Sequence, residues 1–255
     1  MTSAATNTDM TGAVEPRLRV PFVIAHAGEA ALQPLVFVHR PSSGLRLSYA
    51  DPRRGDEVRG VLRARVLNNR QGEERWKLLN TARQWRCMEK LLCQVCGQAA
   101  ADPETGRIPW ITTATAFREI PGVADSGLTS APPTCAPCIP ESLSSCPRLH
   151  VSSAVWTVAT TTPAAVLTDM YSPDLNGKPV HTGERNFFVG LDEPDLLRYA
   201  LATQLVVRLH DMQPAPHLAG TPQARGGTEG PPSRAAAPQL PASGGARQRP
   251  LAGQT

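Results

Sequence analysis

The chain has 255 residues and a net charge of +4, which is too small an excess to indicate nucleic-acid binding by itself. It contains no run of 18 apolar residues, and its beginning lacks a basic start followed by an apolar core. We therefore expect neither a transmembrane helix nor a secretory signal. A cytoplasmic location follows, where cysteine pairs are metal ligands or redox thiols more often than structural disulfides.

Both ends of the chain are poor in large apolar side chains. Residues 1–15 are small and polar, and residues 213–255 consist mainly of Pro, Ala, Gly, Gln and Arg. Such segments bury too little apolar surface to offset the entropy lost on ordering, so we predict that both are disordered. The expected domain is a single α+β unit over residues 16–212.

Strands are predicted at several places before residue 70. Residues 44–50 give the clearest pattern, because Leu45, Leu47 and Tyr49 alternate with polar side chains, as in a half-buried strand. Runs rich in apolar or β-branched residues predict the others. The predicted strands of this part are residues 17–24, 35–39, 44–50 and 58–67.

Residues 73–92 predict a helix, because apolar side chains recur at spacings of three and four. A second stripe on this helix is formed by Arg83, Arg86 and Lys90. Residues 51–90 carry eleven Arg or Lys against six Asp or Glu, so this is the basic part of the chain. The stripe is either a solvated face or a surface that contacts phosphate groups.

The second half of the chain predicts strands at residues 154–159, 165–171 and 186–191, which are rich in Val, Thr and Phe. A second main helix is predicted over residues 193–211. Asp192 would cap its start, and its apolar face would consist of four leucines. These leucines are Leu197, Leu201, Leu205 and Leu209.

Two Cys-x-x-Cys pairs are the strongest motif in the chain. Cys93 and Cys96 form the first pair, and Cys135 and Cys138 form the second, with 38 residues between the two pairs. Two thiolates spaced in this way can bind one metal ion from a tight turn, and two such turns complete a tetrahedron. Four thiolates leave no open position for water, so we expect a structural Zn²⁺ ion.

The segments around these cysteines predict a treble-clef-like zinc subdomain over residues 91–147. Gly97 would supply the positive φ of a zinc knuckle. Residues 106–111 would form a hairpin arm, and the second pair would enter a helix over residues 139–145. The expected fold is therefore α+β, with antiparallel strands and two main helices around a treble-clef-like zinc-binding insertion.

Other uses of the four cysteines stay open. HNH nucleases combine a similar zinc scaffold with catalytic histidines, but no histidine lies between Cys96 and Cys138. The second pair resembles the Cys-x-Pro-Cys motif of thioredoxin-type oxidoreductases, although a polar segment precedes it. Iron is a further possibility, as in rubredoxin, but the second pair lacks the glycine that follows each rubredoxin pair.

The remaining cysteines and the histidines give no catalytic pattern. Cys87 and Cys146 are interpreted as small buried residues, and a role for either in the metal site stays open. None of the six histidines is spaced from an Asp, Cys or Ser as catalytic residues are. No catalytic residue is therefore predicted.

Residues 83–97 and 132–138 resemble those of an uncharacterised family of conserved hypothetical actinobacterial proteins. The resemblance extends over most of residues 17–211 and implies one bacterial cytosolic unit centred on the four cysteines, with no assigned activity. We therefore expect a zinc-stabilised binding protein without enzymatic activity. Its partner would be a protein or a nucleic acid, and not a membrane. A degenerate HNH-type nuclease and a thiol redox protein are the alternatives.

Overall fold

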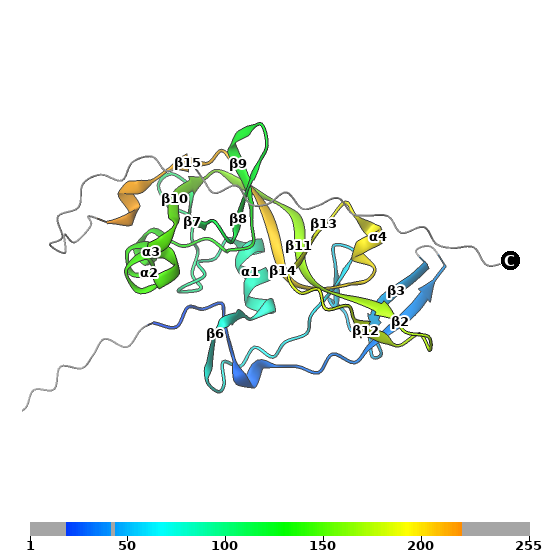
Figure 1. Cartoon of the computed structure of the whole chain (residues 1–255). Helices are drawn as coiled ribbons and strands as arrows, with labels where there is room; N and C mark the ends of the chain where they lie inside the picture. Colours follow the sequence, from blue (N-terminus) through cyan, green and yellow to red (C-terminus); the bar gives the residue numbers. More distant parts are fainter. Residues whose placement is uncertain (1–18, 42–43, 221–255) are drawn as a thin grey trace, which may run out of the picture. The chain divides into compact units, whose positions relative to one another are not determined.

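The computed structural model describes residues 19–41 and 44–220 (Figure 1). The elements up to residue 90 are β1 (Ile24–His26), η1 (Ala27–Glu29), β2 (Leu35–Arg40), β3 (Gly44–Tyr49), β4 (Glu57–Val58), β5 (Val61–Arg63), β6 (Glu74–Leu79) and α1 (Thr81–Lys90). Those that follow are β7 (Ile108–Thr113), β8 (Phe117–Ile120), β9 (Val123–Thr129), η2 (Ala136–Cys138), α2 (Ile139–Ser145), α3 (Pro147–Val151), β10 (Ser153–Val158), β11 (Thr160–Pro173), β12 (Pro179–His181), β13 (Phe187–Gly190), α4 (Pro194–Leu197), β14 (Ala200–His210), β15 (Gln213–Pro214) and η3 (Pro216–Ala219).

The largest sheet is organised around β14. One edge of β14 pairs antiparallel with β11 over most of its length, from His210 opposite Thr160 to Ala200 opposite Met170. Its other edge pairs in parallel with β5 and then antiparallel with β9. The sheet continues through β12 and β13 beyond β11, through β4 beyond β5, and through β8 beyond β9 (Figure 1). The central strand is thus the last long strand in the sequence.

Helix α1 packs on β14 and is tied to it by a buried amide. Gln84 is 0 % exposed, and its side-chain amide donates hydrogen bonds to the carbonyl oxygens of Leu205 and Ser130 at 2.9 and 2.8 Å. The Leu205 amide donates in return to the Gln84 carbonyl oxygen at 2.9 Å. The side chain therefore completes backbone hydrogen bonding that no neighbouring strand supplies at this point.

Three smaller sheets complete the structure. β10 pairs with β7 on one side and β15 on the other, β2 pairs with β3 in a hairpin, and β1 pairs with β6 in a two-stranded ribbon. One apolar core joins Val158 of β10, Leu205 of β14 and Trp85 of α1, and it also contains Cys93 and Cys138. The cysteine region is thus part of the main core.

The sequence patterns predicted about half of the strands. β2 and β3 confirm the strands predicted at residues 35–39 and 44–50, and β10, β11 and β13 confirm those of the second half. The two remaining predictions hold only in part. β1 begins at Ile24, at the end of the segment predicted as a strand, and the segment 58–67 contains the short β5.

The helix predicted over residues 73–92 is wrong in its first half. Residues 74–79 form β6, and α1 begins after Asn80, whose side chain accepts a hydrogen bond from the Arg83 amide at 3.1 Å. Leu91, with φ of 52°, ends the helix. The helix therefore starts at a side-chain cap that lies inside the predicted range. Residues 73 and 74, the glutamates at the predicted start, lie before the helix.

The second main helix, predicted over residues 193–211, is also wrong. Only residues 194–197 form a helical turn, α4, and β14 follows. Leu205 and Leu209 lie on one face of this strand in the main core, because a spacing of four is also a multiple of two. The register of β14 against β11 shifts between Ala202 and Gln204, and Leu201 packs in a separate cluster with Leu47 and Leu62. Strands make up 43 % of the described residues and helices 18 %, so the fold is mixed but dominated by sheets.

The predicted zinc insertion does not stand apart from the rest of the chain. β7, predicted as part of a hairpin arm, pairs instead with β10, and β9 pairs with β14. The hairpin within residues 91–147 is β8–β9. The predicted disordered segment 1–15 lies outside the described residues, as does the tail from residue 221. Residues 213–219, assigned to that tail by the sequence, form β15 and η3.

Candidate metal centre

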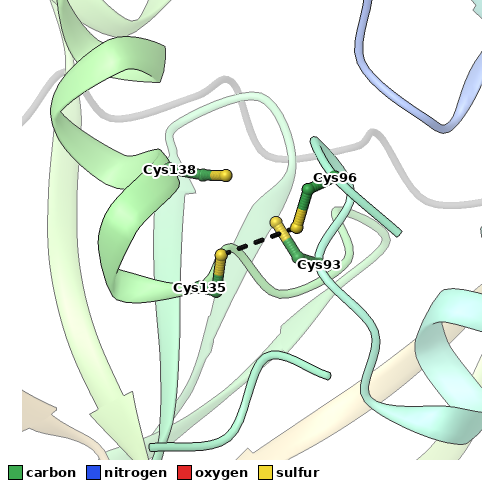
Figure 2. Close-up of side chains that lie close together, drawn as sticks. All are labelled: Cys93, Cys96, Cys135 and Cys138. Carbon is green, nitrogen blue, oxygen red and sulfur yellow. Dashed lines mark hydrogen bonds between the residues drawn. The ribbon is translucent and has the colours of Figure 1, made fainter. Parts of the chain in front are cut away.

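The structure brings Cys93, Cys96, Cys135 and Cys138 into one cluster. Their Sγ atoms all lie within 4.8 Å of one another, and those of Cys96 and Cys135 are 3.7 Å apart. Figure 2 shows the four side chains directed toward one another, with Cys138 at the start of a helix. Zinc–sulfur bonds of about 2.3 Å place the sulfur atoms of a tetrahedral site about 3.8 Å apart. The cluster therefore has the donor atoms and the size to hold a metal ion.

The first pair lies in a tight turn. The Gly97 amide donates a hydrogen bond to the Cys93 carbonyl oxygen at 2.8 Å, and the Val95 amide donates to the Cys93 Sγ at 3.4 Å. Gly97 has φ of 74°, as predicted for a knuckle, and a Cβ atom there would lie 3.0 Å from the Phe22 ring. Glycine is required both for the backbone angle and for the close approach of that ring.

The second pair lies at the start of two consecutive short helices. Cys135 precedes η2 and Cys138 precedes α2, which spans residues 139–145 as the sequence predicts. The Cys138 amide donates to the Cys135 carbonyl oxygen at 2.9 Å. This turn holds the two thiols of the pair on the same side of the backbone.

The two pairs are connected directly by Gln94, which lies between the first two cysteines. Its backbone amide donates to the Pro133 carbonyl oxygen at 2.8 Å, and its side chain donates to the Thr134 hydroxyl at 2.9 Å. Thr134 is 0 % exposed, and its amide donates to the Pro109 carbonyl oxygen of β7 at 3.2 Å. The cluster is therefore preorganised by the protein backbone.

The protein surroundings favour protonated thiols at the second pair of the cluster. Burial raises the pKa of Cys138 to about 11, and burial also raises the pKa of Cys135. At Cys96, burial is outweighed by hydrogen bonds, which lower the pKa of the thiol. A bound cation favours the thiolate form, so metal binding at this site releases protons. One cation of the protein is close: Arg19 Nη1 lies 3.9 Å from the Cys138 Sγ and 3.5 Å from Glu141. It offsets part of the negative charge that four thiolates would create.

The other two cysteines are not part of the cluster. Cys87 is 0 % exposed, and burial raises the pKa of its thiol to about 12, so it is a core residue. Cys146 is half-buried at the end of α2. Among residues 19–41 and 44–220, the four-cysteine group is the one place where three or more His, Cys, Asp or Glu side chains have metal-binding geometry.

The structure separates the three basic residues predicted to contact phosphate. Arg86 and Lys90 are exposed on α1. Arg83 is 1 % exposed and pairs with Glu29, which is 2 % exposed, and one of the two nitrogen–oxygen distances is 2.7 Å. The prediction is wrong for Arg83, because a guanidinium that is buried and paired with a buried carboxylate cannot reach a phosphate group in solution.

No feature of the sequence predicts that Arg83 pairs with Glu29. Glu29 lies 54 residues before Arg83, in a short 3₁₀ turn after β1, and it also accepts hydrogen bonds from the His26 and Arg70 amides at 2.8 and 2.9 Å. Burial alone would raise the pKa of Glu29, but the hydrogen bonds from Arg83 and these amides lower it to about 2. The pair joins the β1 segment to α1. The sequence also gives no indication that Arg19 lies beside the four-cysteine cluster.

The fold and the site define a sheet-rich protein with a four-cysteine cluster that could hold a metal ion. Comparison of the sequence with protein-family models found no match. Comparisons with curated proteins and with solved structures found no match either. Within the described part of the chain, no helix is both long and apolar enough to cross a membrane.

Proposed function

We propose that this chain is a zinc-stabilised binding protein without enzymatic activity. The observation that carries the proposal is the convergence of four Sγ atoms within 4.8 Å. With four thiolate ligands a zinc ion has no free coordination position, whereas catalytic zinc sites keep one for water or substrate. The ion would therefore stabilise the fold and take no part in a reaction.

The burial of the cluster supports this structural role. Cys93 is 0 % exposed and Cys138 is 4 % exposed, and both belong to the core that contains Trp85 and Trp110. A metal ion in this position would connect the turn after α1 with the start of α2. We further propose that the order of knuckle, hairpin β8–β9 and helix α2 makes the region treble-clef-like.

The alternative of a thiol redox protein is less well supported. Thioredoxin-type chemistry uses the two cysteines of one motif and needs a thiol of low pKa as the attacking group. Burial raises the pKa of both Cys135 and Cys138, and the Cys135 Sγ contacts Cys96 of the other pair. The HNH alternative lacks the catalytic histidines of that family, because no histidine lies between Cys96 and Cys138.

The partner would be a protein or a nucleic acid in the cytoplasm, where free thiols persist. Arg86 and Lys90 of α1 are exposed and are the members of the predicted phosphate-contacting stripe that support this idea. Loss of DNA binding at low salt in the double variant Arg86→Ala/Lys90→Ala would support a role for this helix.

Metal analysis of the purified protein tests the zinc proposal. We expect about one zinc ion per chain. Replacement of any of the four clustered cysteines by serine should lower this content, whereas Cys146→Ser, the matched control, should retain it. A colourless protein would also distinguish zinc from iron, because iron–thiolate sites absorb visible light. Zinc below about half an equivalent per chain would contradict the proposal.

A further inference from the structure

The β1–β6 ribbon carries an irregularity that exposes part of β6. Ile24 pairs with Leu79, but the next residue of β1, Ala25, pairs with Arg75. Residues 76–78 therefore have no partner on β1 and form a bulge. Bulges bend a strand and change the direction of its side chains, and they are common at binding sites. Figure 1 shows β6 outside the large sheet formed by β11 and β14.

The bulge exposes two large apolar side chains. Trp76 is 48 % exposed and Leu78 is 59 % exposed. By contrast, Trp85 and Trp110 are 0 % exposed, and Trp156 is half-buried. Of the four tryptophans, Trp76 is thus the one that presents a large part of its surface to solvent.

A cavity of about 310 Å³ lies beside Trp76. Its walls are mainly apolar and include Val23, Ile24 and Ile111, and polar groups such as Gln94 and Ser142 also line it. The volume is at the lower end of the range found for small organic ligands, and such sites usually combine apolar walls with a few polar groups. A flat aromatic group of the size of a nucleobase fits this description.

A second cavity of about 490 Å³ is lined by other residues of the same strand. Arg75, Lys77 and Arg185 contribute three cations to its wall, and all three are exposed. Among residues 19–41 and 44–220, no carboxylate forms an ion pair with any of these cations. The acidic residues in the wall are Asp169 and Glu29, and Glu29 is neutralised by Arg83.

We propose that this ribbon binds single-stranded nucleic acid. An unpaired base would stack on Trp76 at the apolar cavity, and the adjoining phosphates would contact Arg75, Lys77 and Arg185. Exposed aromatic side chains beside cations are the usual basis of single-strand binding, because every base has a face that can stack. Bases in a duplex are already stacked on each other, so the ribbon selects single strands. The inference rests on the proposed binding function and names its partner.

The binding of a fluorescently labelled oligothymidylate of about ten nucleotides, followed by anisotropy, tests this proposal. Trp76→Ala should weaken binding by about tenfold or more, and Trp76→Phe should restore most of the affinity because it keeps an aromatic face. Lys77→Ala and Arg185→Ala should each reduce the slope of log affinity against log salt by about 0.7. An oligouridylate of the same length distinguishes RNA from DNA.

Lys178→Ala, in the turn between β11 and β12, is the matched control, because it removes an exposed cation outside the ribbon, and it should leave the affinity unchanged. Unchanged affinity in Trp76→Ala would overturn the proposal, as would an equal loss of affinity in Lys178→Ala. Absence of binding to either oligonucleotide at low salt would also overturn it, and would favour a protein partner. Zinc content, measured separately, distinguishes these outcomes from failure of the zinc-stabilised fold.

Discussion

Replacement of Glu29 by glutamine should destabilise the protein strongly at neutral pH. The change removes the charge that neutralises Arg83, and both side chains are at least 98 % buried. A buried charge left without its partner costs about 3–5 kcal/mol, which is a large part of the stability of a typical domain. Asp195→Asn is the control, because Asp195 is 86 % exposed and pairs with Arg198 on the surface. Its loss should cost less than about 1 kcal/mol.

The same pair predicts how stability depends on pH. The pKa of Glu29 is about 2 in the folded state, compared with an ordinary value of 4.5. Between these two values the unfolded chain binds a proton that the folded protein does not, so stability falls as the pH falls. The full contribution is about 3 kcal/mol, and about 2 kcal/mol of it is lost by about pH 3.

Urea unfolding followed by circular dichroism at pH 7 and pH 3 measures both effects. Acid would also protonate the thiolates of the proposed metal site, but this effect is common to the wild type and the variant. The difference in unfolding free energy between them therefore isolates Glu29, and it should shrink by about 2 kcal/mol at the lower pH. A difference that stays constant between the two pH values would refute the reasoning.

Three further predictions concern the cysteine region and the core. Gly97→Ala should lower the free energy of unfolding in urea by more than about 1–2 kcal/mol and weaken zinc binding, because the added Cβ atom meets Phe22. Gly177→Ala is its control: Gly177 has a similar φ of 76° but open space around it, so this variant should lose only the roughly 1–2 kcal/mol that a positive φ costs a residue with a Cβ atom. Gln84→Leu should cost at least about 3 kcal/mol in the same assay, since it leaves backbone groups of Leu205 and Ser130 unpaired in the core. Treatment with a chelator at neutral pH, which would remove the proposed zinc ion, should lower the stability by about 5 kcal/mol or more and abolish the near-ultraviolet circular dichroism. An unchanged free energy of unfolding in any one of these three experiments would contradict the corresponding prediction.

The four-cysteine cluster could be predicted because its determinants are local. Two cysteines separated by two residues can share one turn whatever surrounds them, and two such turns suffice for four ligands. The buried pair of Arg83 and Glu29 could not be predicted in this way. Its members lie 54 residues apart, and neither segment has a pattern that distinguishes a buried charge from a surface charge.

Both errors in the helix predictions come from the spacing of apolar side chains. Leu205 and Leu209 of β14 are four residues apart, and this spacing keeps side chains on one face of either a helix or a strand. The β-branched Thr203, Val206 and Val207 favour a strand, and they could have decided the question. In the segment 73–92, the apolar periodicity continues across the true start of the helix. Asn80 is a good helix cap, and it could have indicated that start.

The place of β14 in the sequence determines when the large sheet can form. Its N-terminal end pairs with β5, where Leu201 lies opposite Leu62, and its C-terminal end pairs with β9. During synthesis, β5, β9 and β11 leave the ribosome before the strand that they share. Contacts between such distant residues make folding slow. A nascent chain that ends before residue 200 therefore exposes unpaired strand edges, which makes it a substrate for chaperones.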